Sequence, residues 1–400
     1  MPKSTKFVET FEKWVGVKHY SSFKYLDKYL RRKYGKQKTD QLLEVIDQRA
    51  RGLLVDIYPL LYEDLDLSID LLSLNGDMHR NYLAWFSEQD FGSPLNILDV
   101  ACGNGYLTCF YATKFPGSQV LGVDNSHQAI ECATELARRL KLTNVKFEVV
   151  DVAGPELSSL PQGQDLITAI TAFRSMLTFP DFDNSRPLRQ LLQTYRQSVR
   201  IDALNNLSSL LLPRKGIFLS FERWQHLRGF GWWVCAIQNA GLFVDFTESG
   251  PFSFTSLASE RVEQGPVLWC RSNDENAVQN LDDTISFWLL SKYRKDFDKY
   301  KTFDLHHDLA EAAFVSINPK ILLRGAKAVS GESAVRRIEI WQAGPFLLFF
   351  QFDSEGNRSL EVLPSVLYDG VAARLDELAK ALKSEGEVTF YDQTEVIWAD

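Results

Sequence analysis

The segment Leu95–Tyr106, LNILDVACGNGY, constrains the possible folds of this chain more than any other stretch of its sequence. An apolar run ends in an acid, Asp99, and the glycines Gly103 and Gly105 follow it. This order predicts a buried strand, a tight turn and the start of a helix, a layout that brings a nucleotide-like ligand against bare backbone. A dinucleotide fingerprint needs a third glycine at position 108, where the chain has Thr108. The segment therefore favours a ligand without a pyrophosphate.

Residues 95–272 alternate between strand-like and helix-like runs, which is typical of a parallel sheet with crossover helices. The strand-like runs are Asn96–Val100, Gln119–Asp124, Val145–Val150, Asp165–Ile170, Gly216–Phe221, Phe243–Thr247 and Pro266–Cys270. The helix-like runs are Tyr106–Phe115, His127–Leu140, Leu188–Leu212 and Gly229–Ala240. The sequence therefore predicts an α/β fold with a seven-stranded, doubly wound sheet.

The regions on either side of this core have a different character. The N-terminal region carries apolar side chains at helical spacing, and we expect a helical cap there. After residue 276, a helix-like run is followed by strand-like runs, and Asp353–Asn357 has the composition of a hairpin loop. Because 400 residues exceed one compact core, we expect a cap over residues 1–90, a central domain over 91–273 and a C-terminal α+β appendage over 274–400.

The composition limits the partners of the chain. Its formal net charge is −8 and its pI is about 5.4, which argues against nonspecific nucleic-acid binding. Five cysteines without a C-x-x-C pair favour reduced thiols packed as small apolar groups. Neither a signal-peptide core nor a run of about 18 apolar residues is visible, so we expect a soluble, cytoplasmic protein without a membrane segment. No metal-ligand spacing stands out, and a homodimer is left open.

One segment departs from the acidic balance of the chain. Between Lys13 and Lys38, nine lysines and arginines stand against a single acid, Asp27. Such a run is typical of a solvated helix face, and the alternative is a patch for an anionic substrate or partner.

Three acids stand at the ends of three successive predicted strands, namely Asp99, Asp124 and Asp151. Ligands of open α/β sheets bind outside the carboxyl ends of the strands, so we expect these acids to meet in one crevice beside the glycine turn. Asp124 follows Gly105 by 19 residues, the spacing at which an acid meets ribose hydroxyls. Asp151 could accept from an adenine amine, and Val152 could offer its backbone amide to a ring nitrogen.

With these motifs in order, residues 95–175 resemble the cofactor-binding half of the class I, Rossmann-like S-adenosylmethionine-dependent methyltransferases. LDVACGNGY is similar to their glycine motif, GVDNS to their ribose-binding acid and VVDV to their adenine-binding segment. The resemblance implies S-adenosyl-L-methionine as cofactor, S-adenosyl-L-homocysteine as product, and a sheet with a reversed last strand. The cofactor-binding residues that it implies are Asp99, Ala101, Gly103, Gly105, Asp124, Asn125, Asp151, Val152 and Thr171.

The same resemblance assigns roles around the glycine turn. Asp99 would orient the turn and approach the methionine amino group, and Gly103 and Gly105 would let the backbone approach the methionine moiety. Tyr106 stands where many members of the family have a small residue, from which we expect a tighter pocket.

Residues that face the methyl acceptor should come from the loops after the fourth and fifth strands. Family members that methylate nucleobase amines or glutamine carry a polar residue, Pro-Pro and an aromatic after the fourth strand, whereas this chain has Thr171–Arg174, TAFR. After the fifth strand, Glu222 and His226 are the candidate catalytic bases, and Arg223 could hold an anionic substrate. His79 and Arg80 of the cap could close over the cofactor.

These observations predict a methyltransferase that acts on an O, N or C atom of a small molecule. The helical cap and an inserted region, Phe179–Leu192, could enclose a compact pocket for such an acceptor. Three alternatives are a protein acceptor that docks on the C-terminal appendage, an RNA acceptor, and a non-catalytic scaffold that binds S-adenosylmethionine.

Overall fold

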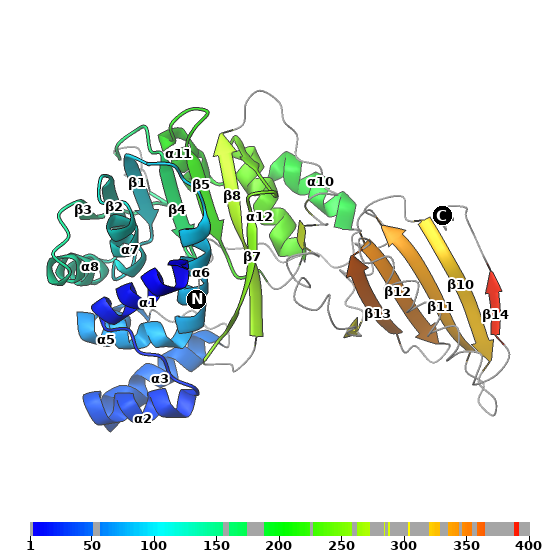
Figure 1. Ribbon diagram of the computed structural model, residues 1–400, viewed down its shortest axis with the longest axis horizontal. Helices are drawn as coiled ribbons and strands as arrows, with labels where there is room; N and C mark the ends of the chain where they lie inside the picture. Colours follow the sequence, from blue (N-terminus) through cyan, green and yellow to red (C-terminus); the bar gives the residue numbers. More distant parts are fainter. Residues whose placement is uncertain are drawn as a thin grey trace. The chain divides into compact units, whose positions relative to one another are not determined.

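In the computed structural model, the chain forms two compact units (Figure 1). The first unit holds Met1–Phe179, Arg200–Arg223 and Asn239–Ala277, and the second holds Pro180–Val199, Trp224–Gln238 and Val278–Asp400. The residues that the structure describes are 3–50, 57–154, 160–173, 188–224, 227–257 and 262–272, three positions at 284, 287 and 288, and the strands named below for the second unit. The expected domain boundaries at residues 90 and 273 stay a prediction.

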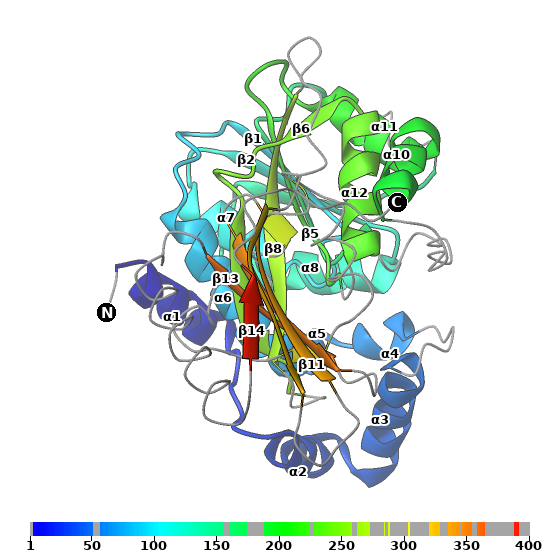
Figure 2. The ribbon, with the colours of Figure 1, turned by 90° about the vertical axis from the view of Figure 1, so that its right-hand side faces the viewer.

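The N-terminal region is helical, as predicted. Its elements are α1 (Lys3–Val15), α2 (Phe23–Tyr34), α3 (Lys36–Ala50), α4 (Tyr58–Leu61), α5 (Leu65–Leu72), the 3-10 turn η1 (Ser73–Asn75) and α6 (Gly76–Glu88). Helix α5 begins at a capping residue, Asp64, whose carboxylate accepts from Leu67 N at 2.8 Å. Leucines of α2, α3 and α5, among them Leu26, Leu42 and Leu71, form a small core of their own. Figure 2 shows α2 and α3 at one end of the central sheet.

The central sheet confirms the predicted fold class. Its strands are β1 (Asn96–Val100), β2 (Gln119–Asp124), β3 (Val145–Val149), β4 (Leu166–Ile170), β5 (Ile217–Phe221), β6 (Leu242–Val244), β7 (Gly250–Thr255) and β8 (Val262–Ser272). Their order is β3-β2-β1-β4-β5-β8-β6, and β8 runs antiparallel to its neighbours. This seven-strand path contains all seven predicted strands. Strands β4 and β5 are buried at every position, as expected for central strands covered on both faces.

Strand β7 was not predicted from the sequence. It pairs antiparallel with β8, outside the seven-strand path. Its sequence, GPFSFT, begins with the glycine and proline that usually mark a turn, and only the pairing with β8 makes it a strand. The sheet therefore carries a hairpin of β7 and β8 at its edge.

Helices join the parallel strands at the predicted places. They include α7 (Tyr106–Lys114), α8 (His127–Arg139) and α11 (Asp202–Leu210) in the first unit. In α8, the Ser126 hydroxyl accepts from Ala129 N at 3.2 Å and caps the first turn, and Arg138 and Arg139 lie in the last turn. The predicted single helix Leu188–Leu212 is instead two helices, α10 (Leu188–Ser198) and α11, because Ile201 has an extended backbone before α11.

The second unit contains α10, α12 (Leu227–Asn239) and a six-stranded antiparallel sheet. Its strands are β9 (Phe303–Asp304), β10 (Lys320–Ala328), β11 (Val335–Ala343), β12 (Phe346–Asp353), β13 (Arg358–Pro364) and β14 (Val388–Tyr391). The antiparallel pairing of β12 with β13 agrees with a hairpin connection at the predicted loop. The helix-like run expected directly after residue 276 lies outside the described residues, apart from the three positions 284, 287 and 288.

Candidate functional site

The glycine turn after β1 has an unusual backbone. Ala101, Gly103 and Gly105 all have positive φ angles, of 55°, 54° and 75°. The Cys102 amide donates to Val123 O at 2.9 Å, and the Gly105 amide donates to Cys102 O at 3.0 Å. The turn is therefore fixed against β2, and its two glycines supply the left-handed conformations that side chains rarely adopt.

Gly105 has a packing role as well as a conformational one. A Cβ atom at this position would lie 2.8 Å from Ala133 Cβ on α8 and 2.9 Å from Phe147 Cζ on β3. Gly105 also stands at the N-cap of α7, in the left-handed conformation. The structure therefore places this glycine in the packing of α7 against its neighbours.

Asp99 is fully buried at the end of β1, and its two carboxylate oxygens have protein partners. Thr108 on α7 donates to Oδ2 at 2.5 Å, and Thr168 on β4 donates to Oδ1 at 2.7 Å. Burial raises the pKa of Asp99 to about 6, against the opposing effect of the two threonine hydroxyls. Thr108, the residue that breaks the dinucleotide fingerprint, therefore holds this acid.

Asp124, at the end of β2, is the acid that contacts the glycine turn. Its Oδ2 accepts from the Gly103 amide at 3.0 Å, and its Oδ1 accepts from the Ser126 amide at 3.0 Å. Burial raises the pKa of Asp124, and the backbone amides that it accepts from act in the opposite direction. The carboxylate is partly exposed, so it can still accept from a ligand.

The third acid lies beside the second. The Val150 amide donates to Asp124 O at 2.9 Å, which aligns the end of β3 with the end of β2. Asp151 is exposed, and its Oδ1 accepts from the Ala153 amide at 2.9 Å, whereas Val152 is buried. Together with the exposed Asn125, these residues line the carboxyl ends of neighbouring parallel strands, where the sequence placed them.

The loop after β4 is bonded to the loop after β5. Thr171, with a φ of 56°, donates from its amide to Phe221 O at 2.7 Å. Glu222 is buried, and its Oε1 accepts from the Phe173 amide at 2.7 Å. Glu222 therefore anchors one loop to the other. His226, the other candidate base, lies outside the described residues.

Tyr62 is a site residue that the sequence interpretation missed. It follows α4 in the cap, and a Cβ atom at Gly103 would lie 2.6 Å from its hydroxyl. Burial raises the pKa of Tyr62, and the negative charge of Asp124 raises it further. The hydroxyl therefore lies over the glycine turn, near the acid of β2. No local pattern predicts this contact, since Tyr62 is 41 residues before Gly103 in the sequence.

Two further contacts join the cap to the central domain. Asn104 Nδ2, in the glycine turn, donates to the hydroxyl of Ser68 on α5 at 3.1 Å. Asp66 of α5 forms an ion pair with Arg139 of α8 at 2.5 Å. The cap therefore covers the turn through direct side-chain bonds.

His79 and Arg80 of α6 lie in a buried polar cluster of the cap. Arg80 donates from Nε and a terminal nitrogen to Glu12 Oε2, at 3.0 and 2.8 Å. His79 packs edge-on against Tyr106, and burial, followed by the charge of Arg223, lowers its pKa to about 4. Arg80 therefore has a carboxylate partner within the protein.

The basic segment between Lys13 and Lys38 is partly neutralised by acids of the cap. Within the described residues, four of its nine basic side chains form ion pairs. The pairs are Lys18 and Lys33 with the buried Asp70, Arg31 with Asp27 and Asp40, and Lys38 with Glu63. This finding favours a structural role for much of the segment over a patch for an anionic partner.

Among the residues that the structure describes, no group of three or more His, Cys, Asp or Glu side chains is arranged to hold a metal ion. None of the described helices has the length and apolar character needed to span a membrane.

This chain is similar to known methyltransferases over part of its length. A family model described as a methyltransferase domain matches residues 92–211. The malonyl-[acyl-carrier protein] O-methyltransferase of Acetivibrio thermocellus is 33% identical over 94 residues, which cover 24% of this chain and 31% of that relative. The (S)-coclaurine N-methyltransferase of Thalictrum flavum is 31% identical over 84 residues, covering 21% of this chain and 22% of that relative. The chain thus spans less than a third of these curated relatives.

A solved structure is similar as well. The carbon methyltransferase CurJ aligns with 63% of this chain and 71% of its own, with a TM-score of 0.39 and 13% identity. At this level of similarity, the strand order described above is the firmer description of the fold.

Proposed function

Since this chain belongs, through residues 92–211, to the class I, Rossmann-like S-adenosylmethionine-dependent methyltransferase family, we propose that it transfers a methyl group from S-adenosyl-L-methionine to a small-molecule acceptor. The single observation that carries the proposal is the hydrogen bond from the Gly103 amide to Asp124. It joins a bare backbone turn to a partly exposed carboxylate, which is the combination needed to hold an adenosine by its ribose hydroxyls.

The residues of the site fit this cofactor. Asp124 is partly exposed and each of its oxygens can accept a second hydrogen bond, and Asp151 and Val152 lie on the neighbouring strand end, where an adenine ring would be. A Cβ atom at Gly103 would lie 2.6 Å from the hydroxyl of Tyr62, so the bare backbone of the turn lets this side chain approach closely. We therefore assign Tyr62 to the cofactor site as well, as a hydrogen-bond partner from the cap.

Asp99 acts in this proposal through its neighbours. Both of its oxygens accept from threonines, so it ties β1, β4 and α7 together beneath the turn. When bound, the cofactor would supply a methyl group on a positively charged sulfur, which is electrophilic without further activation. The protein then has to position the acceptor in line with that methyl group and exclude water. A cap bonded to the glycine turn serves both needs.

The acceptor is proposed to be a small molecule because the cap lies over the turn. Two relatives are named for the small molecules coclaurine and trans-aconitate, which supports this acceptor class, whereas a third is named for an acyl group carried on a protein. A base role for Glu222 or His226 stays a prediction. The contact between Glu222 and the Phe173 amide supports positioning of the loop after β4 as a further role. A cytoplasmic location and a homodimer remain predictions of the sequence.

Calorimetric titration with S-adenosylhomocysteine tests the proposal. We expect saturable one-site binding to the full-length protein and no binding of NAD. If neither S-adenosylhomocysteine nor NAD released heat of binding, a cofactor site would be contradicted. Binding of NAD in place of S-adenosylhomocysteine would identify a different class of enzyme. Binding without methylation of any compound in a broad acceptor screen would favour the non-catalytic scaffold.

A further inference from the structure

Helix α2 has two opposite faces. Its leucines, Leu26 and Leu30, are buried in the small core of the cap. Three cationic side chains are exposed and follow one another at intervals of four residues, namely Lys24, Lys28 and Arg32. At about 100° per residue, these three positions fall within an arc of about 80° on the side of the helix opposite the leucines. They are called the basic stripe below.

The basic stripe carries positive charge that the protein leaves uncompensated. Within the described residues, Lys24, Lys28 and Arg32 form no ion pair, whereas four other basic side chains of the segment do. The acid of α2, Asp27, already binds Arg31 at 2.7 Å. The stripe therefore presents three cations to the solvent, with no acid among them.

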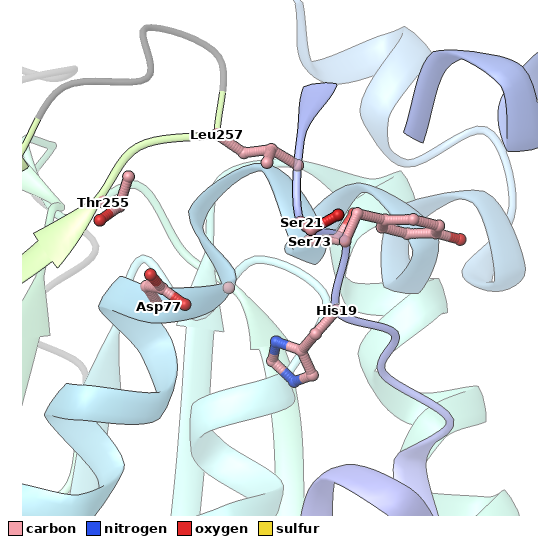
Figure 3. A pocket seen from close by; sticks show the side chains of 8 residues that line it. His19, Ser21, Ser73, Asp77, Thr255 and Leu257 are labelled. Atoms are coloured by element: carbon pink, nitrogen blue, oxygen red, sulfur yellow. The ribbon is translucent and has the colours of Figure 1, made fainter. Parts of the chain in front are cut away.

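The segment that leads into α2 marks where the stripe begins. In Figure 3, His19 and Ser21 of this segment border a polar depression together with Ser73 and Asp77. The acid of that depression, Asp77, belongs to α6. No residue of the basic stripe is among those that line the depression, so the stripe is a surface of α2 itself.

An exposed aromatic ring lies beside the stripe. Tyr25 is 60% exposed, and it directly follows Lys24 on the helix. Among the described residues, the other exposed aromatic side chain is Trp14, at 50%, and it also follows a lysine, Lys13. A phenol has an apolar body and a polar tip, and it favours the boundary between water and lipid headgroups. Cations and an aromatic ring on one helix therefore suit an anionic lipid surface.

The charge of the rest of the chain decides which anionic partner fits. The segment from Lys13 to Lys38 carries +8 and the whole chain −8, so the remaining residues carry −16. Figures 1 and 2 both show α2 at the outer end of the first unit. A flat anionic surface can meet this end while the acidic remainder stays in solvent. A single-stranded nucleic acid, in contrast, is held in a basic groove that follows its backbone. One convex helix therefore fits a membrane surface better.

We propose that the basic stripe binds the surface of membranes that contain anionic phospholipids, with Lys24, Lys28 and Arg32 at the lipid phosphates and Tyr25 among the headgroups. This surface goes beyond the proposed function and does not depend on it. The contact is peripheral, because the leucines of α2 are buried in the cap and cannot enter the lipid. Each lysine or arginine close to such a membrane strengthens binding by about five-fold.

Sedimentation with lipid vesicles tests the stripe. We expect the protein to bind vesicles of three parts phosphatidylcholine to one part phosphatidylserine, and not to bind vesicles of phosphatidylcholine alone. Binding should decrease as the salt concentration rises from about 0.05 to about 0.5 M, because salt screens exposed charges. Lys24→Gln combined with Lys28→Gln should weaken binding by about 25-fold, and glutamine is compatible with the helix.

The matched control replaces two exposed lysines outside the cap. Lys146→Gln on β3, combined with Lys215→Gln before β5, removes the same charge, and we expect unchanged binding to the anionic vesicles. Both double variants should bind S-adenosylhomocysteine as the wild type does. A failure of vesicle binding is therefore distinguishable from a failure of the proposed function.

A fluorescent label locates the contact on the molecule. All five cysteines are buried, so a cysteine introduced at an exposed position can be labelled selectively. A polarity-sensitive dye on the Tyr25→Cys variant should shift to the blue on the anionic vesicles, because it enters the headgroup region. The same dye on Thr143→Cys, at an exposed position between α8 and β3, should show no shift.

Four results would overturn the proposal. The first is a wild type that does not bind the anionic vesicles, and the second is equal binding by the two double variants. The third is a dye shift at position 143 and not at position 25. The fourth is binding of a polyuridine RNA without binding of vesicles, which would identify a nucleic acid as the partner of the stripe.

Discussion

The carboxylate of Asp124 accepts a hydrogen bond from the backbone amide of Gly103, at 3.0 Å. The acid at the end of β2 and the glycine turn after β1 are thus bonded to each other, although 21 residues separate Asp124 from Gly103 in the sequence. In that unit, the bare backbone and the negative charge face the same space.

Replacing Asp124 tests its assignment to the ribose. Asp124→Ala should lower the affinity for S-adenosylhomocysteine roughly 100-fold, because hydrogen bonds to a charged group contribute about 1.5–3 kcal/mol each. Titration calorimetry measures the change, and circular dichroism should show an intact fold. Affinity equal to that of the wild type would remove the ribose assignment.

Tyr62→Phe tests the part of the cap that lies over the turn. Loss of one neutral hydroxyl should weaken S-adenosylhomocysteine binding by about 3–10-fold, since such a hydrogen bond contributes about 0.5–1.5 kcal/mol. Tyr58→Phe serves as the control, because its ring stacks on that of Tyr62 at a centroid distance of 6.1 Å. If both variants bind as the wild type does, Tyr62 only covers the turn.

Gly105→Ala should destabilise the fold. The positive φ of 75° is unfavourable for alanine, and its Cβ atom would meet Ala133 and Phe147 within 3 Å. We expect a loss of about 2–4 kcal/mol in the free energy of unfolding, from backbone strain and overpacking together. Gly163→Ala is the matched control, because its φ of 76° is nearly the same and its Cβ atom would meet nothing within 4 Å. Urea denaturation compares the two, and similar stability of both variants would contradict the packing role of Gly105.

The buried Asp99 predicts a dependence of stability on pH. Its folded-state pKa is about 6, whereas an unfolded aspartate has a pKa of about 3.9. The folded protein therefore binds this proton more tightly, and its stability falls as pH rises from about 4 to about 6. The difference corresponds to about 3 kcal/mol, an order-of-magnitude figure. Asp99→Asn should remove this component, so unfolding free energies of the two proteins, measured from pH 4 to 7, should diverge below pH 6. Parallel curves would contradict the burial effect.

The predictable part of the fold is the part with a local pattern. The sheet from β1 to β5 consists of apolar runs that end in acids or turns, so the strand ends and the glycine turn follow from spacing alone. Strand β7 has no such pattern, because Gly250 and Pro251 give it the composition of a turn. Its strand conformation depends on pairing with β8.

In the candidate site as well, some positions follow from local sequence patterns and others depend on tertiary packing. The positions of Asp124 and Asp151 follow from the ends of their strands, but the partners of Asp99 could not be predicted, since Thr168 is 69 residues away in the sequence. In the sequence, Thr108 marks only the missing third glycine of a dinucleotide fingerprint, and its bond to Asp99 depends on the orientation of α7 against β1. Tyr62 comes from another part of the chain through tertiary packing alone.

A crystal structure of the protein with S-adenosylhomocysteine would show whether Asp124 holds the ribose. We expect both ribose hydroxyls within hydrogen-bond distance of the Asp124 carboxylate, with the homocysteine part against Gly103. A ligand bound elsewhere on the chain, or a ribose directed away from Asp124, would contradict it.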